Sequence, residues 1–176
     1  YGCRSCMIAC KVENNTSQGI HWMYVFRNEE GEYPDSHVWS LPRPCQHCDN
    51  APCVKVCPVG AMFKREDGIV VTDHDRCIGC RYCEVACPYG VIYFNWKDPA
   101  KNQYFDWNEV GAESMGEVVG GATPAYRNPD FDFEYRGGGE SEGREIAGGS
   151  HHKGVVEKCT FCVHRVSQGL EPACAN

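Results

Sequence analysis

The chain has 176 residues, enough for one ordinary domain or two small ones. Its net charge of −7 excludes the basic face that nucleic acid requires, so we expect no nucleic-acid partner. Its mean hydropathy of −0.48 argues against a large, wholly apolar core, and no apolar run is long enough to span a membrane.

Fourteen cysteines are the compositional outlier, and they divide the chain into four groups. In chain order the groups are Cys3, Cys6 and Cys10; Cys45, Cys48, Cys53 and Cys57; Cys77, Cys80, Cys83 and Cys87; and Cys159, Cys162 and Cys174. The third group reads CxxCxxCxxxCP. The second reads CxxCxxxxCxxxCP, so it carries two extra residues between its second and third cysteines.

Only short regular elements are predicted between these groups. Residues 7–13 and 82–86 each suit one or two helical turns after a cysteine, and residues 69–72 and 91–94 are β-rich runs typical of short strands. Gly68 favours a turn before the first of these strands. Asp73, His74 and Asp75 are expected to close the turn before Cys77.

Residues 97–155 differ from the rest because they contain two glycine-rich stretches, 116–121 and 137–149. We predict a long irregular insertion here, since structureless loops of this length are usually functional or disordered. Its aromatic residues favour contact with a partner, and a solvated loop is the alternative. His151 and His152 fall in this insertion, where a surface position is expected.

The first and third cysteine groups repeat each other, as a search for internal repeats reveals. The aligned pairs are Gly2 with Gly79, Arg4 with Arg81, and Ala9 with Ala86. The alignment predicts a further cysteine immediately before Tyr1. Extending the CxxxC spacing from Cys174 predicts another, two residues beyond Asn176.

The run CxxCxxC lets one loop supply three thiolates to an iron–sulfur cluster, and the fourth cysteine, followed by proline, ligates the neighbouring cluster in two-cluster ferredoxins. We therefore pair the second group with the third and the first with the fourth, which predicts four [4Fe–4S] clusters. The expected ligand sets are Cys45, Cys48, Cys53 and Cys87; Cys77, Cys80, Cys83 and Cys57; Cys159, Cys162, Cys174 and Cys10; and Cys3 and Cys6 with two ligands outside the chain. Because the outer groups are incomplete, [3Fe–4S] stays open for one of the outer two clusters.

Two other uses of these cysteines are disfavoured by their spacing. Zinc favours two CxxC pairs in one tetrahedral site and needs neither a third cysteine two residues on nor a terminal Cys-Pro. A disulfide framework is typical of shorter secreted chains whose cysteines are spread out. No motif for substrate chemistry is present, so we predict no catalytic residue.

Residues beside the cysteines are candidates for tuning the clusters through burial and charge. The expected apolar packing comprises Ile8, Val54, Ile78, Val85 and Val163. Cations that would favour a reduced cluster, or else lie solvated at the surface, are Arg4, Lys11, Arg81, Lys158 and Arg165. His47 and His164 lie beside ligands, but the cysteine count leaves no need for either as a ligand.

The order of the four groups resembles the four-cluster ferredoxin subunit of the dimethyl sulfoxide reductase (molybdopterin oxidoreductase) family, which includes polysulfide, tetrathionate and nitrite reductase types and alternative complex III. The resemblance covers residues 1–96 and 156–176. It implies an α+β, tandem bacterial-ferredoxin-like fold with two pseudo-symmetric two-cluster modules, short strands, short helices and the long irregular insertion. We expect residues 1–20 and 156–176 to form an outer module, incomplete at both ends, residues 41–96 an inner module, and residues 97–155 the insertion.

The resemblance also implies a role. Such a subunit is not an enzyme by itself but relays electrons between a molybdopterin-type catalytic subunit and an integral membrane subunit that interacts with quinone, in a hetero-oligomer. It would be a peripheral membrane protein bound through its partners, and the export of several relatives favours the periplasmic or outer face over the cytoplasm. The alternative is a free-standing polyferredoxin electron carrier.

Overall fold

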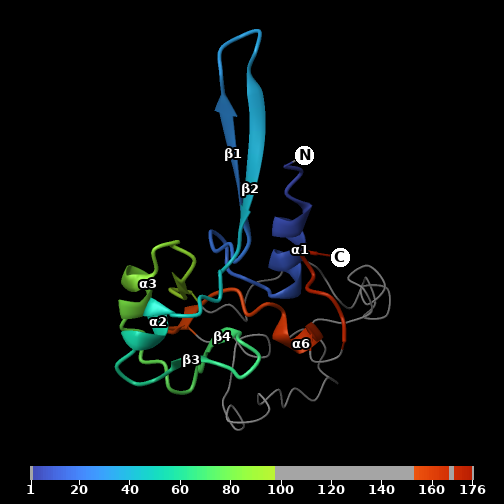
Figure 1. Cartoon of the computed structure of the whole chain (residues 1–176). Helices are drawn as coiled ribbons and strands as arrows, with labels where there is room; N and C mark the ends of the chain where they lie inside the picture. The colour runs from blue at the N-terminus through green and yellow to red at the C-terminus, as the bar shows by residue number, and fades with distance from the viewer. Residues whose placement is uncertain (1, 98–152, 167–168, 176) are drawn as a thin grey trace.

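The computed structural model describes residues 2–97, 153–166 and 169–175. Short helices and two-stranded antiparallel sheets make up this part of the chain (Figure 1), which is the α+β character expected of a ferredoxin-like fold. The elements are α1 (Ser5–Glu13), β1 (Tyr24–Glu30), β2 (His37–Arg43), α2 (Pro52–Lys55), β3 (Met62–Lys64), β4 (Val70–Thr72), α3 (Tyr82–Ala86), β5 (Tyr93–Phe94), β6 (Val156–Glu157) and α6 (Val163–Val166). In the described ranges, no helix has the length and apolarity that crossing a bilayer demands.

Helix α1 confirms the helical turns predicted over residues 7–13. It begins after Arg4, whose left-handed backbone (φ 65°) turns the chain into the helix. Met7, Cys10 and Glu13 recur every three residues and form its buried face. The helix therefore directs the last cysteine of the first group into the interior.

The segment between the second and third groups forms a hairpin of β3 and β4. Phe63 of β3 pairs with Val71 of β4, and the turn between the strands uses Gly68 at φ 87°. The predicted strand over residues 69–72 and the turn at Gly68 are thus confirmed. The predicted closure before Cys77 is also confirmed, because the Asp73 carboxylate accepts the backbone N–H of Asp75 at 3.2 Å and the Asp73 carbonyl accepts that of Cys77 at 3.1 Å.

Strand β5 is shorter than the predicted strand over residues 91–94, because only Tyr93 and Phe94 pair. Their partner is β6, which lies on the far side of the insertion in sequence, and Phe94 opposes Val156. This pairing brings the chain leading to the fourth cysteine group against the segment that follows the third. The body of the predicted insertion, residues 98–152 with His151 and His152, lies outside the described residues.

The hairpin of β1 and β2 was not predicted from the sequence. It projects from the rest of the described fold (Figure 1), and Phe26 pairs with Leu41 in its register. Every residue from Phe26 to Trp39 is exposed. The hairpin therefore contributes little to the interior beyond Val25 at its base.

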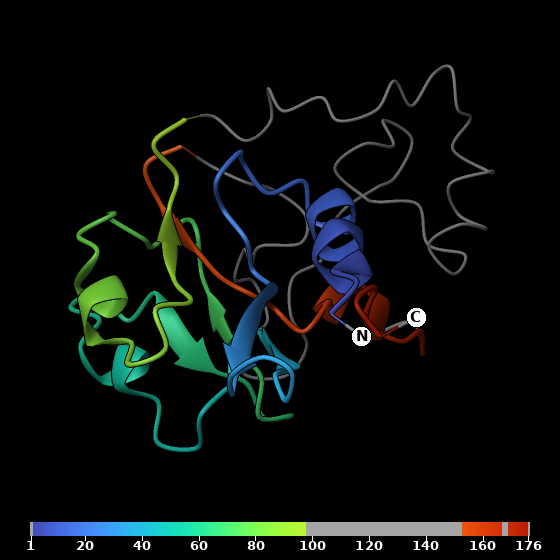
Figure 2. The same ribbon diagram turned by 90° about the horizontal axis from the view of Figure 1, so that it is seen from above.

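The interior of the described fold consists of small apolar clusters, and two of them contain buried cysteines. One cluster holds Met7, Cys10, Ile20, Trp22, Met23 and Val25. A second holds Ala51, Cys53, Met62, Val70, Cys83, Ile92 and Val156. Figures 1 and 2 place α2 beside α3 at one side of the fold and α1 near α6 at the other.

Candidate metal centres

The second and third cysteine groups are positioned by equivalent short helices. Cys53 lies in the first turn of α2, which begins at Pro52, where a missing N–H costs nothing. Cys83 lies in α3, which begins after Arg81 in a left-handed conformation (φ 61°). Both cysteines are buried, and the two helices contact each other. The remaining cysteines of these groups lie in the loops and turns around the helices.

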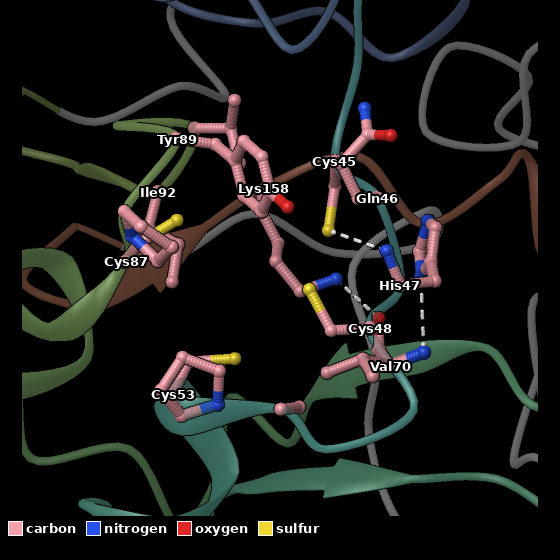
Figure 3. Close-up of a pocket in the computed structure, with 14 residues that line it drawn as sticks. Cys45, Gln46, His47, Cys48, Cys53, Val70, Cys87, Tyr89, Ile92 and Lys158 are labelled. Carbon is pink, nitrogen blue, oxygen red and sulfur yellow. Dashed lines mark hydrogen bonds between the residues drawn. The ribbon is translucent and has the colours of Figure 1, made fainter.

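One cavity collects four of these cysteines, Cys45, Cys48, Cys53 and Cys87 (Figure 3). Proline and aliphatic side chains complete most of its wall. The apolar members are Ala51, Pro52, Val70, Pro88, Val91 and Ile92. The last cysteine of the third group thus joins the first three of the second, as the sequence grouped them.

A second cavity takes its cysteines from the same two groups in the opposite proportion. It is lined by Cys57 from the second group and by Cys77, Cys80 and Cys83 from the third. Apolar side chains and a cation surround them, namely Val59, Ala61, Met62, Ile78, Val156 and Arg81. The two cavities are neighbours. The Cys53 thiol at the first cavity is close enough to the Cys83 thiol at the second to raise its pKa, although burial is the larger cause.

The third set of cysteines gathers where α1 meets the fourth group. Burial raises the pKa of the Cys10 thiol well above its usual value, and the nearby thiols of Cys159, Cys162 and Cys174 raise it further. These are the four cysteines that the sequence grouped for a third cluster. The side-chain amide of Asn14, one turn after Cys10, points at the Cys10 and Cys162 sulfurs at 3.7 and 3.9 Å.

Cys3 and Cys6 lie at the edge of this region. Cys3 is exposed, and its thiol contacts the Ser5 hydroxyl at 3.4 Å. Cys6 packs against the apolar cluster that contains Cys10. Burial is the main cause that raises the pKa of the Cys174 thiol, and the nearby Cys6 thiol raises it further. The two further ligands predicted for this set stay a prediction.

Backbone amides point at sulfurs in two equivalent places. The N–H of His47 donates to the Cys45 sulfur at 3.5 Å, and that of Phe161 donates to the Cys159 sulfur at 3.4 Å. Both bonds span two residues in a CxxC loop, and the donors His47 and Phe161 have left-handed backbones. Such amides stabilise negative charge on sulfur.

Several thiols at these sites have raised pKa values, which favour the protonated form, whereas a metal binds the thiolate form. Burial, followed by repulsion from neighbouring thiols, raises the pKa of Cys83 to about 12. Burial likewise raises the pKa of Cys162 to about 12 and that of Cys159 to about 11. Iron binds thiolates, so the positive charge of iron at these sites would favour ionisation of the thiols.

The donor set fits an iron–sulfur cluster. All fourteen cysteines are unpaired, so none is used in a disulfide. Four soft sulfur donors around one apolar cavity are what a [4Fe–4S] cluster takes. Among the described residues, no three His, Cys, Asp or Glu side chains are grouped to hold a single metal ion.

The expected apolar packing is partly wrong. Val163 is buried, Val54 packs against the inner core cluster, and Ile78 lines the second cavity although it is 64% exposed. Ile8 and Val85, in contrast, are 61% and 82% exposed, because each lies on the solvent side of a short helix in a small fold. Most of the apolar walls come from residues that no cysteine motif marks, such as Ile92 and Met62.

The candidate cations differ in how much of each side chain is exposed to solvent. Lys158 and Arg165 are each 1% exposed, whereas Arg4 and Arg81 are exposed. Arg81 stacks over Phe94 and Trp96. Arg165 lies 3.5 Å from the carboxylate of buried Glu13.

Both candidate histidines have other contacts. The Nδ1 atom of His47 accepts the backbone N–H of Val70 at 3.0 Å, and burial together with nearby Lys158 lowers the pKa of His47 to about 4. The His164 ring lies 2.7 Å from the Glu13 carboxylate. Glu13 itself was missed by sequence reasoning, although its place one turn after Cys10 in a helix marks it as inward-facing.

Comparison with known proteins gives the same chemistry. A model described as a 4Fe-4S dicluster domain matches residues 37–104. The arsenate respiratory reductase iron–sulfur subunit of Shewanella sp. is 41% identical over 99% of this chain and 72% of its own length. The chain belongs to the family of iron–sulfur subunits of the dimethyl sulfoxide reductase type.

Further members of this family are more distant. An iron–sulfur subunit from Halobacterium salinarum, described as that of a putative dimethyl sulfoxide reductase, is 40% identical over 98% of this chain. A selenate reductase subunit from Mesobacillus selenatarsenatis is 37% identical over 98%. The chain spans 56% and 52% of their respective lengths. The predicted class, an electron-transfer subunit of an oxidoreductase complex rather than a catalytic one, is that of the family.

Proposed function

We propose that this chain carries four iron–sulfur clusters and relays single electrons between a molybdopterin-type catalytic subunit and a quinone-linked membrane subunit. The observation that carries the proposal is the crossed composition of the two inner cavities. Each takes three cysteines from one group and the last cysteine of the other. This exchange is the ligand pattern of two-cluster ferredoxins.

The proposed ligands are the four sets named from the sequence. Cys45, Cys48, Cys53 and Cys87 hold one [4Fe–4S] cluster, and Cys77, Cys80, Cys83 and Cys57 hold the next. Cys159, Cys162, Cys174 and Cys10 hold a third, and Cys3 and Cys6 contribute to a fourth. When bound, each cluster accepts and releases one electron at a time.

The tandem arrangement of two related modules is also proposed. In its support, Gly2 and Gly79 have φ values of 61° and 68°, and Arg4 and Arg81 have φ values of 65° and 61°. Each arginine precedes a helix that holds a buried cysteine. Equivalent residues in the first and third groups thus share one backbone course.

The thiols that influence one another indicate a linear order of the four sets. Cys83 of the second cavity neighbours Cys53 of the first, and Cys45 of the first neighbours Cys159 of the third set. Cys174 of that set neighbours Cys6. The order supports a relay with two ends, one for each partner subunit.

The chain's own residues hold and insulate this path. The cysteines fix each centre from two separate segments, so a centre cannot move without moving both. Val91 and Ile92 line the first cavity with buried apolar side chains, and low polarity around a centre limits the reorganisation that electron transfer requires. Partners are proposed to bind this chain in a peripheral membrane complex, with the periplasmic or outer face favoured.

Anaerobic purification of the full-length protein tests the proposal. We expect a brown protein whose broad absorbance bleaches with dithionite and whose EPR-monitored redox titration resolves four clusters. Zinc in place of iron, or cysteines joined in disulfides, would contradict it. Mild purification of the complex should retain the two partner subunits, whereas elution of a stable monomer alone would favour the free-standing polyferredoxin carrier.

A further inference from the structure

Lys158 occupies an unusual position for a lysine. It directly follows β6 and precedes Cys159, and only 1% of its surface is exposed. Its side chain reaches into the wall of the first cavity, where its nitrogen points toward Cys48 (Figure 3). The ammonium donates hydrogen bonds to the carbonyl oxygens of Val70 and, at 3.0 Å, Cys159.

Burial of an ammonium among uncharged partners is unfavourable unless a negative charge compensates it. The backbone carbonyls of Val70 and Cys159 solvate the cation but do not neutralise it. The thiols around the first cavity provide that charge once they are ionised and hold a cluster. A thiolate-ligated cluster beside Lys158 therefore accounts for a lysine in the interior.

Lys158 lies beside two cysteine sets. It lines the first cavity together with Cys45, Cys48, Cys53 and Cys87. It also directly precedes Cys159 of the third set, and its ammonium donates to the carbonyl oxygen of that residue. Lys158 therefore lies at the boundary between the two sets.

Other lysines of the described fold are placed differently. Lys55 lies between two cysteines of the second group but is exposed. Lys64 pairs with Asp49 at 2.9 Å. Lys11 is only partly buried, and it donates to the carbonyl oxygens of Thr16, Ser17 and Ile20 in the loop after α1 at 2.8–3.1 Å.

We propose that Lys158 is a positioning residue that holds a buried positive charge between two cysteine sets and raises the reduction potentials of the clusters they hold. The first set is Cys45, Cys48, Cys53 and Cys87, and the third is Cys10, Cys159, Cys162 and Cys174. Reduction adds one electron to a cluster and neither forms nor breaks a bond, so the reduced centre is more negative by one charge. A fixed cation beside it stabilises that state more than the oxidised state. The inference rests on the proposed function, since it requires clusters at these sets.

EPR-monitored redox titration of the full-length protein tests this role. In Lys158→Gln, we expect at least a tenfold loss in the equilibrium constant for reducing one or both of these clusters, a fall of about 59 mV for one electron. Lys158→Arg keeps the charge and should restore most of the potential. Lys55→Gln is the matched control, because it removes a lysine two residues from Cys53 that is exposed to solvent; all its potentials should stay at the wild-type values.

Equal potentials in wild type and Lys158→Gln would overturn the inference, and so would an equal fall in Lys55→Gln. If Lys158→Gln loses iron, Lys158→Met is titrated in its place. Loss of iron from both variants but not from Lys158→Arg would show that the lysine is needed to assemble the site, and would also overturn a role in setting potential. Failure of the proposed function is distinct, because the wild-type protein would then have no reducible clusters.

Discussion

At the level of single residues, the buried carboxylate of Glu157 links segments that are distant in sequence. Glu157 is fully buried in β6, and its oxygens accept the Trp22 indole N–H at 3.2 Å and the Asn95 amide at 2.7 Å. Trp22 precedes the β1–β2 hairpin, and Asn95 follows β5. One side chain therefore joins three segments that are distant in sequence.

Replacing Glu157 by alanine should destabilise the fold markedly. The change leaves the buried Trp22 and Asn95 donors without this acceptor, which costs about 2–4 kcal/mol. We expect the thermal midpoint followed by circular dichroism to fall by roughly 4–16 °C. Glu157→Gln should fall less, because its amide oxygen still accepts one bond.

Glu66→Ala is the control for this experiment, since Glu66 is exposed. Its midpoint should stay within a few degrees of wild type, because surface substitutions usually change stability by no more than about 0.5 kcal/mol. A fall in Glu66→Ala equal to that in Glu157→Ala would mean that the hydrogen bonds of Glu157 contribute nothing specific.

At the level of elements, the CxxC loop before α3 depends on a glycine. Gly79 has φ 68°, and a Cβ atom there would overlap the carbonyl oxygen of Gly154 and the ring of Phe94. The loop is thus pressed against the chain leading into β6. Gly60 has a similar φ of 64°, but a Cβ atom there would meet nothing within 4 Å.

Comparison of Gly79→Ala with Gly60→Ala isolates the effect of this contact. Both substitutions carry the left-handed backbone penalty of about 1–2 kcal/mol, but only Gly79→Ala must also displace backbone between Cys77 and Cys80. We expect Gly79→Ala to lose the iron of the second cavity and Gly60→Ala to retain it. Iron analysis and EPR measure the difference, and full iron content in Gly79→Ala would refute the contact.

The β1–β2 hairpin makes a separate prediction. Residues 28–39 are all exposed, so replacing them by an Asn-Gly turn between Arg27 and Ser40 removes no buried side chain. We expect unchanged iron content and a thermal midpoint within roughly 2–4 °C of wild type. A large loss of either would mean that the hairpin supports the fold beyond its base.

The same elements indicate how far sequence reasoning reaches. Helices α1 and α3 and strand β4 were predicted because cysteine spacing and β-branched runs are local signals. The β1–β2 hairpin was missed because its strands carry charged residues and Pro42, which breaks a strand pattern except at an edge. The burial of Lys158 was not predictable, because it depends on the pairing of β5 with β6 across the insertion.

At the scale of the whole molecule, the proposed relay places the four cysteine sets in a line rather than in a compact group. In this order the first cavity has neighbours on both sides, through Cys53 and Cys45, and the second cavity is an end whose Cys83 neighbours Cys53. An electron on one centre repels an electron on the next, so neighbouring centres titrate as coupled groups. The line therefore predicts which centres influence each other's potentials.

Removal of a middle centre should affect more of the molecule than removal of an end centre. Two unit charges roughly 15 Å apart at an effective dielectric constant of about 20 interact by about 1 kcal/mol, or roughly 50 mV for one electron. Cys53→Ala removes a proposed ligand of the first cavity, and we expect centres on both sides of it to become easier to reduce by a shift of this order. Cys83→Ala, the matched change in α3, should shift only the centre at the first cavity. EPR-monitored titration measures each shift, and equal effects of the two variants on the centre held by Cys159 would contradict the linear order.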